Sequence, residues 1–340
     1  MKPADVVVIG QAPGPELHLL PVGATVQRLL VTCGDGVRRD VVLGLPDGDA
    51  VRTSTDYVGS IVGRYANRIE HGRFVLDGVE HELPANDRGH HLHGGPDGFH
   101  VRTWAVIEKS AEEVTFELVS PDGDAGYPGE LTVRATYRVV GDEVRLDITA
   151  TTTSPTIVNL TSHAYLNLHG AGTIDDHLLQ IDASRYTPVG ADSIPIGGHA
   201  AVVGTPFDLR TPTRLGDPIR AADPQVRDAR GIDHNFVLDG SGWRRVAVLD
   251  GPATRTRLEL WSDQPGVQVY TGNFLAGTAL DRTGRLLRQG DGLCLEPQLA
   301  PDTPNRGPVG VGSDADWPSA VLRPGEIYRN RMGWRFSSLR

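Results

Sequence analysis

The sequence predicts an all-β protein, folded as one large antiparallel β-sandwich. Short segments of the chain alternate apolar and polar residues with a period of two, as half-buried strands do. The 41 glycines and 24 prolines separate these segments with turns. No run of ten or more residues has the three- and four-residue apolar spacing of an amphipathic helix. Because the turn-forming residues are spread evenly and no linker interrupts them, we expect residues 1–340 to form a single domain.

The clearest element is a hairpin over residues 131–150. Val133, Ala135 and Tyr137 alternate with polar residues, and Gly141-Asp142 supplies a turn. The alternation continues to residue 150, so one face of the hairpin is apolar and covers a core. Shorter strands are predicted at residues 72–78, 114–118, 178–181, 257–260 and 292–295. The helical candidates are short, and residues 55–60 are one of them.

The composition argues against several classes of protein. A net charge of −10 and a pI near 5.6 do not suit a nucleic-acid-binding surface. No segment approaches the ~18 apolar residues of a membrane span, and the residues from Met1 onward do not begin a signal peptide. Cys33 and Cys294 are the only thiols, which does not suggest a disulfide-stapled secreted scaffold. We therefore expect a soluble cytoplasmic protein.

Residues 89–95 contain three histidines, His90, His91 and His93, followed by two glycines. A metal site needs convergent ligands, but an extended chain places His91 and His93 on one face and His90 on the other. No cysteine lies nearby in the sequence, and no H-E-x-x-H spacing occurs. We therefore predict no metal site. A histidine followed by two glycines instead predicts an imidazole exposed beside a tight turn, where it can contact a substrate.

Two further residues offer acid–base chemistry from distant parts of the chain. In a strand, His163, Tyr165 and Asn167 would share one polar face, which suggests the wall of a pocket. Glu296 ends an apolar strand, and a carboxylate in that position is paired, exposed or functional. Asp302 is expected to form a loop instead. An imidazole and a carboxylate together supply the acid and the base of a proton-transfer enzyme.

Six blocks of the chain, in the same order, resemble the aldose 1-epimerase family, also called galactose mutarotases. They are residues 63–69 (GRYANRI), 92–95 (LHGG) with Gly98-Phe99, 159–163 (NLTSH), 233–236 (DHNF), 268–274 (QVYTGNF), and 295–298 (LEPQ) with Pro301-Asp302. One block alone is a weak signal, whereas six in order are a strong one. The resemblance implies a large antiparallel β-sandwich that needs no cofactor and interconverts the α and β anomers of free aldoses such as galactose and glucose.

The resemblance also implies a role for each site residue. Glu296 would be the general base that takes the proton of the anomeric hydroxyl, and His163 would be the general acid that protonates the ring oxygen. The residues that would hold the sugar hydroxyls are His93, Arg68, Asn67, Asp233 and Gln268. The expected partner is a small-molecule sugar, without nucleic acid, membrane, metal or cofactor. The chain is expected to be a monomer or a homodimer.

Ordinary pKa values fit this assignment. An unperturbed Glu titrates near ~4.3 and an unperturbed His near ~6.5, so Glu296 would be ionised and ready as a base near neutral pH. A nearby carboxylate such as Asp233 would help to keep His163 protonated, because an opposite charge favours the cation.

Two positions depart from the family pattern. Pro297 stands where a Thr is common between the Glu and the Gln of the last block, and Leu166 stands where an aromatic residue is usual. Both changes leave the proposed acid and base in place. They put the preferred sugar in question, so a different carbohydrate is an alternative.

Three rival functions use the same residues. A non-catalytic carbohydrate-binding β-sandwich would use the polar groups without proton transfer. A glycoside hydrolase would need two carboxylates beside the bond; Glu296 and Asp233 could supply them, but His163 would then have no role. An epimerase of phosphorylated sugars would need basic residues at the pocket, for which Arg64 and Arg68 are the candidates.

Overall fold

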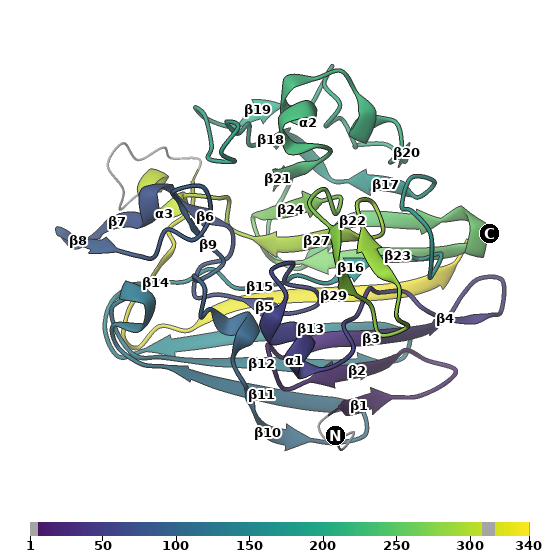
Figure 1. Cartoon of the computed structure of the whole chain (residues 1–340), viewed down its shortest axis with the longest axis horizontal. Coiled ribbons are helices and arrows are strands. Elements are labelled where there is room, and N and C mark those ends of the chain that lie inside the picture. Colours follow the sequence, from purple (N-terminus) through teal and green to yellow (C-terminus); the bar gives the residue numbers. More distant parts are fainter. Residues whose placement is uncertain (1–5, 308–316, 340) are drawn as a thin grey trace.

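The structure is a computed structural model of the chain, and it describes residues 6–307 and 317–339. The first five residues, which enter the expectation about a signal peptide, lie outside this range. The largest sheet in the described part of the chain has nine antiparallel strands (Figure 1). In sheet order these are β10 (Ala105–Lys109), β11 (Glu113–Ser120), β12 (Leu131–Val140), β13 (Glu143–Thr152), β29 (Tyr328–Ser338), β23 (Thr256–Ser262), β22 (Arg244–Gly251), β17 (Leu178–Ile181) and β20 (Thr213–Arg214).

Two smaller antiparallel sheets complete the main layers. The six-stranded sheet has the order β16 (Tyr165–Leu166), β27 (Leu293–Gln298), β24 (Gly266–Tyr270), β21 (Asp233–Leu238), β18 (Ala183–Tyr186) and β19 (Ala200–Ala201). The four-stranded sheet has the order β1 (Val7–Gly10), β2 (Glu16–Leu20), β3 (Thr25–Thr32) and β4 (Arg38–Asp40).

Five pairs of short strands in the described residues lie outside these three sheets. They are β5 (Ile61–Val62) with β15 (Thr161–Ser162), β6 (Arg68–Ile69) with β9 (His91–Leu92), β7 (Arg73–Leu76) with β8 (Val79–Glu82), β14 (Thr156–Ile157) with β28 (Val321–Leu322), and β25 (Ala276–Leu280) with β26 (Leu286–Arg288). The pair β6–β9 brings the blocks at residues 63–69 and 92–95 together, and the bridge Tyr65↔Asn159 adds the block at residues 159–163.

Apolar side chains from all three sheets meet in one core. Leu29 of β3, Leu146 and Ile148 of β13, Val269 of β24 and Leu295 of β27 belong to the same cluster, and each is at most 2% exposed. Because alternate residues of a strand point to opposite faces, the polar residues between them face away from this core. The prediction of a mostly antiparallel β-sandwich is confirmed.

The predicted hairpin is also confirmed. β12 and β13 pair over their whole length from Leu131↔Thr152 to Val140↔Glu143, and Gly141-Asp142 forms the two-residue turn. The strands predicted at residues 72–78, 114–118, 178–181 and 257–260 correspond to β7, β11, β17 and β23. The strand predicted at residues 292–295 is longer than expected, because β27 continues to Gln298 and places Glu296 inside the strand rather than after it.

The helical candidate at residues 55–60 is wrong. The helix lies just upstream, as α1 (Gly48–Thr53), where the Asp47 carboxylate accepts a hydrogen bond from the Ala50 backbone N–H and caps its first turn. The other α-helices of the described residues are α2 (Pro224–Ala229) and α3 (Thr303–Arg306). The 3₁₀ turns are η1 (Glu70–Gly72), η2 (Phe99–Val101), η3 (Asp124–Gly126), η4 (Pro218–Arg220) and η5 (Pro252–Thr254).

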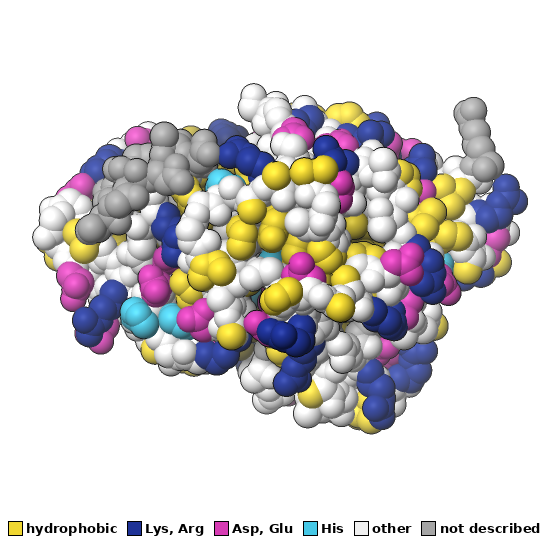
Figure 2. Space-filling model, turned by 90° about the horizontal axis from the view of Figure 1, so that it is seen from above, with side chains coloured by type: hydrophobic (Ala, Val, Ile, Leu, Met, Phe, Trp, Pro, Cys, Tyr) yellow, Lys and Arg dark blue, Asp and Glu magenta, His cyan; other side chains and the backbone are white. Residues whose placement is uncertain are grey.

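Asp302 forms a loop, as predicted. It precedes α3 with a φ of 60°, and its carboxylate accepts a hydrogen bond from the Glu70 backbone N–H and pairs with Arg306. No helix among the described residues is long and apolar enough to cross a membrane. Acidic and basic side chains are interspersed over the described part of the face shown in Figure 2.

Candidate active site

A pocket of about 560 Å³ opens over the six-stranded sheet. Its floor consists of side chains on three neighbouring strands: Glu296 on β27, Gln268 and Tyr270 on β24, and Asp233 on β21. The register pairs Gln268 with Glu296 and Asp233 with Tyr270, so these side chains lie on the sheet face opposite the core. The polar side chains of the pocket floor are therefore held in place by the backbone hydrogen bonds of the sheet.

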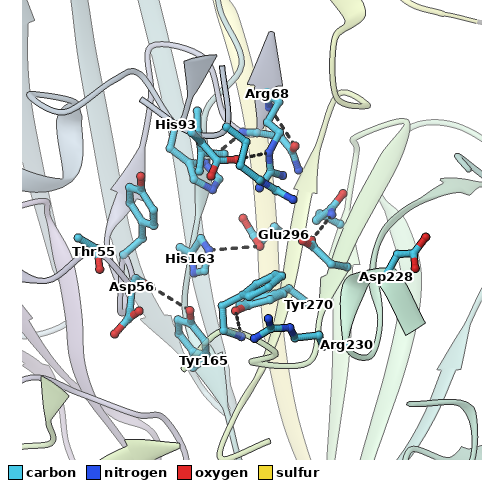
Figure 3. Close-up of a pocket in the computed structure, with 18 of the residues that line it drawn as sticks. Thr55, Asp56, Arg68, His93, His163, Tyr165, Asp228, Arg230, Tyr270 and Glu296 are labelled. Atoms are coloured by element: carbon cyan, nitrogen blue, oxygen red, sulfur yellow. Dashed lines mark hydrogen bonds and ion pairs between the residues drawn. The ribbon is translucent and has the colours of Figure 1, made fainter. Parts of the chain in front are cut away.

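The walls of the pocket come from segments outside that sheet. They are residues 55–57 after α1, residues 67–68 at β6, residues 87–88 and 92–93 around β9, and residues 228 and 230 at the end of α2. In Figure 3, His163 and Glu296 lie at the centre of this arrangement, with His93 and Arg68 on one side and Tyr165, Tyr270 and Arg230 on the other.

His163 and Glu296 face each other at the bottom of the pocket. The His163 Nε2 lies 3.8 Å from Glu296 Oε1, and the two residues are only 4% and 2% exposed (Figure 3). The backbone fixes His163 between β15 and β16, because its N–H donates to Ser60 and its carbonyl accepts from Gly59. Gly59 is required there: its φ is 75°, and a Cβ would lie 2.2 Å from the Val26 carbonyl oxygen.

Burial shifts both groups toward their neutral forms. It lowers the pKa of His163 to about 4, and a hydrogen bond to the residue's own backbone and the attraction of Asp233 for the imidazolium only partly oppose this. Burial, and then the negative charge of Asp233, raise the pKa of Glu296 well above its ordinary value. Contrary to expectation, burial disfavours the ionised form of Glu296, and at His163 removal from water outweighs the attraction of Asp233.

The two protonation patterns of this pair differ only in the position of one proton. A neutral Glu296 with a neutral His163 contains as many protons as an ionised Glu296 with an imidazolium. Hydroxyl groups that donate to the carboxylate would favour the second pattern, since hydrogen bonds to a charged form stabilise it. The pair is therefore suited to move one proton when a polyhydroxy ligand binds.

His93 contributes a second imidazole from the other side. Its ring meets the His163 ring edge-on, with centroids 5.4 Å apart. The Asn67 backbone N–H donates to His93 Nδ1 at 3.1 Å, so the neutral ring carries its proton on Nε2. Both Asn67 and His93 have positive φ, 65° and 51°, a backbone conformation that costs energy and is frequent at functional sites. The tight turn after His93 is present, but the ring is 6% exposed rather than open to solvent.

The remaining predicted residues surround the acid–base pair. Gln268 donates through Nε2 to Asp233 Oδ1 at 2.7 Å, while its own Oε1 has no hydrogen-bond partner among the described residues. Arg68 donates through Nε to Asp87 Oδ2 at 2.8 Å and still lines the pocket. The structure thus brings Asn67, Arg68, His93, His163, Asp233, Gln268 and Glu296 to one cavity.

Other residues that were singled out do not reach the cavity. Arg64 is buried and donates to the backbone carbonyls of Pro128, Gly129, Ser120 and Pro121, so it ties loops together. Asn167 does not share a pocket face with His163, because its amide donates to the carbonyls of Gly172 and Asp291. The chain between His163 and Asn167 forms only the two-residue strand β16, so strict alternation over that stretch was wrong.

The three histidines near residue 90 have separate partners. His91 lies between the Pro84 carbonyl and the Tyr127 hydroxyl. His90 accepts from the His71 backbone N–H and faces Asp192. Only His93 turns into the pocket. The group of described residues whose atoms come close enough to share a cation is instead His163, Cys294 and Glu296, within 4.8 Å of one another.

That group is poorly arranged for a metal ion. The imidazole Nδ1 faces the Cys294 sulfur at 3.4 Å, while the opposite nitrogen, Nε2, faces Glu296. One imidazole nitrogen cannot point at a cation shared with both neighbours, because the two nitrogens diverge. The absence of a catalytic metal stays a prediction.

The two departures from the family pattern lie on the core side of the site. Leu166 is 1% exposed and belongs to the main core cluster. The Pro297 carbonyl accepts from Asn330 Nδ2 at 2.7 Å, and the neighbouring Gln298 is fully buried. Neither Leu166 nor Pro297 lines the pocket, so any effect on sugar choice would act through the packing beneath the floor.

Several pocket residues were not assigned a role from the sequence. The Tyr57 ring lies 4.6 Å from the rings of both His93 and His100, tilted by about 60° to each, and burial raises the pKa of its phenol to about 12. Tyr270 flanks His163 together with Tyr165, which was expected on the pocket wall and does line it, and the Tyr165 hydroxyl donates to the Asp56 carbonyl at 2.9 Å. The block at residues 268–274 contained Tyr270, but Tyr57 had no signal besides the helical pattern wrongly given to its segment.

Comparisons with known proteins agree with this geometry. The family model for aldose 1-epimerase matches residues 5–335 of the chain. The galactose mutarotase of Rattus norvegicus is 41% identical over 324 residues, which cover 94% of this chain and 91% of that protein. The aldose 1-epimerase of Escherichia coli (strain K12) is 34% identical over 342 aligned residues, which cover 98% and 96%.

Solved structures give the same result. An aldose epimerase homologue from C. elegans superimposes with a TM-score of 0.89 at 27% identity, covering 98% of this chain and 99% of that one. The galactose 1-epimerase of Lactobacillus acidophilus superimposes with a TM-score of 0.84 at 28% identity, covering 98% and 94%. On the family match and on identities of 41% and 34% across nearly the whole chain, this protein belongs to the aldose 1-epimerase family.

Proposed function

We propose that this protein interconverts the α and β anomers of a free aldose such as galactose or glucose. The Glu296 carboxylate takes the proton from the anomeric hydroxyl while the His163 imidazolium gives its Nε2 proton to the ring oxygen. The bond between C1 and the ring oxygen breaks, and C1 becomes an aldehyde carbonyl. After the carbonyl turns its other face, the same two protons return and the ring closes as the other anomer.

One observation carries this proposal. An imidazole nitrogen and a carboxylate oxygen lie 3.8 Å apart on the floor of a pocket that is large enough for a hexose. Around them, the N–H of His93, the guanidinium of Arg68 and the amide of Gln268 offer donors and acceptors for hydroxyl groups. The His93 tautomer supports this role, because its Nε2–H has no acceptor among the described residues and is available to a sugar oxygen.

The rival functions receive less support. A hydrolase needs two free carboxylates, but Asp233 accepts from Gln268, and an imidazole lies against Glu296. Among the pocket-lining residues, five are acidic (Asp56, Asp87, Asp228, Asp233 and Glu296) and three are arginines (Arg68, Arg88 and Arg230). This balance favours an uncharged sugar over a phosphorylated one.

Two structural proposals accompany the activity. The chain acts as one domain, since a single core cluster contains residues from Val7 to Phe336. We also propose that it works as a monomer or a homodimer. Sedimentation across a range of protein concentrations tests the second proposal.

Polarimetry of freshly dissolved sugars tests the activity. Freshly dissolved α-galactose and α-glucose should reach their final optical rotation faster with the protein present, while the final rotation itself stays unchanged. Glu296→Gln should remove the acceleration. Glu108→Gln, on the exposed edge strand β10, is the matched control and should retain it. If neither these sugars nor their 6-phosphates change rotation faster with the wild-type protein, the proposed activity is wrong.

A further inference from the structure

Strand β27 carries two side chains that contact the same imidazole. Cys294 and Glu296 are two residues apart, so they project from the same face of the strand. The Cys294 sulfur lies 3.4 Å from His163 Nδ1, and Glu296 Oε1 lies 3.8 Å from His163 Nε2. Each ring nitrogen of His163 therefore faces a different residue of a single strand, and this strand is hydrogen-bonded on both sides.

We propose that Cys294 is a positioning residue for His163, whose neutral thiol accepts the Nδ1–H and so keeps Nε2 as the nitrogen that exchanges a proton with the sugar. The inference rests on the proposed function for the identity of the substrate, but the tautomer that it assigns to His163 can be measured without any sugar. During ring opening the imidazolium gives its Nε2 proton to the ring oxygen and retains the Nδ1–H toward sulfur. Ring closure returns the proton to Nε2.

The two neighbouring histidines then have opposite tautomers. The Asn67 N–H donates to His93 Nδ1, so this ring holds its proton on Nε2 and acts as a permanent donor. At His163 the partner of Nδ1 is a side chain that can accept, so Nε2 is left free to gain and lose a proton. The partner of Nδ1 therefore distinguishes His93, which donates to a sugar hydroxyl, from His163, which moves a proton.

A thiol suits a general acid better than a carboxylate would. A carboxylate at Nδ1 would stabilise the imidazolium and make it a weaker acid, because an opposite charge favours the cation. Burial, together with the charges of Glu296 and Asp233, raises the pKa of Cys294 well above its ordinary value, so the sulfur remains an uncharged thiol. Such a weak acceptor orients the ring without adding negative charge.

Packing alone is the other explanation for this residue. Cys294 is fully buried and belongs to an apolar cluster with Tyr165 and Tyr270. Cys294→Val separates the two roles, because valine fills the space with apolar atoms but cannot accept a hydrogen bond. Cys294→Ser supplies a smaller side chain that can. Cys33→Val is the matched control, since Cys33 is the other buried free thiol and lies in the main core cluster.

The decisive experiment combines kinetics with nitrogen NMR of histidine-labelled protein. Cys294→Val should lower kcat for anomerisation about three- to tenfold, the effect of losing one hydrogen bond, with KM unchanged. Cys294→Ser should retain more of the activity than Cys294→Val, and Cys33→Val should retain all of it. The His163 signals, identified by their loss in His163→Asn, should report the Nδ1–H tautomer in wild type and a mixture of tautomers in Cys294→Val.

Two results would overturn the inference. One is an Nε2–H tautomer for His163 in the wild-type protein at neutral pH. The other is a folded Cys294→Val protein with wild-type kcat, which would leave only a packing role. If the wild-type protein accelerated no anomerisation, the proposed function would fail, while the NMR result would still decide whether Cys294 fixes the tautomer.

Discussion

Replacement of His163 by asparagine should make the protein more resistant to acid. In the unfolded chain the imidazole titrates near ~6.5, whereas in the folded protein burial lowers the pKa of His163 to about 4. Between these values the unfolded state binds one proton more than the folded state. Stability therefore falls as the pH drops from 6.5 toward 4, and His163 is one cause of that fall.

The size of the effect follows from the shift. Each pH unit between the two pKa values is worth about 1.36 kcal/mol, so at about pH 5 the wild-type protein has lost about 2 kcal/mol through this residue. His163→Asn does not titrate and escapes this loss. Relative to wild type, its free energy of unfolding should rise by about 2 kcal/mol when the pH is lowered from about 7.5 to about 5.

Urea denaturation of both proteins at the two pH values measures this difference. His71→Asn is the matched control, because it removes an imidazole whose side chain is 72% exposed rather than buried. If the difference between His163→Asn and wild type is the same at both pH values, His163 does not titrate as a buried group and the reasoning fails.

Four other outcomes are expected. Glu296→Gln and His163→Asn should each lower the turnover number at least about a hundredfold. Because both residues act in one proton transfer, the double variant should lower the turnover number by less than the product of the two single effects. Independent effects in polarimetry would contradict the pairing. Glu296→Gln should gain stability relative to wild type as the pH rises above the unfolded pKa of Glu, since burial raises the pKa of Glu296 in the folded state; parallel melting curves at acidic and alkaline pH would argue against this. Arg68→Ala should mainly raise KM, because Arg68 lines the pocket wall and not its floor; an effect confined to kcat would move Arg68 into the chemical step. Dialysis against a chelator should leave the activity intact, and recovery that required a divalent cation would refute the metal-free assignment.

The seven predicted site residues all line one pocket, but their roles came from the family resemblance, whereas alternation along the chain was reliable only in the long strands. The hairpin of β12 and β13 was readable because ten residues on each side of the turn alternate between core and solvent. Around His163 the strands have only two residues each, so alternation placed Asn167 wrongly. Arg64 and Arg68 share one motif, but the first binds backbone carbonyls and the second lines the pocket. Spacing along the sequence does not distinguish these two roles, because the conformation of the loops decides which arginine reaches the pocket.

The pKa shifts of Glu296 and His163 could not be predicted from residue types. The ordinary pKa values of Glu and His suggested a carboxylate and an imidazolium that are ready at neutral pH. The fold buries both groups and shifts the pKa of each toward favouring its neutral form. Cys294 was missed for a related reason. In an apolar strand a cysteine is expected to be a packing residue, and its contact with His163 joins residues 131 positions apart in the sequence.

The division of the pocket into a sheet floor and loop walls separates two kinds of evolutionary change. Insertions and substitutions at residues 55–57, 87–88 and 228–230 change which sugar hydroxyl groups find a hydrogen-bond partner in the wall. The backbone pairing of β24 with β27, which holds Glu296, stays in register. The preferred sugar can therefore change during evolution while the residues that transfer the proton stay in place. Grafting the wall segments of a relative onto this chain should transfer substrate preference and leave the chemical step to the recipient's own strands.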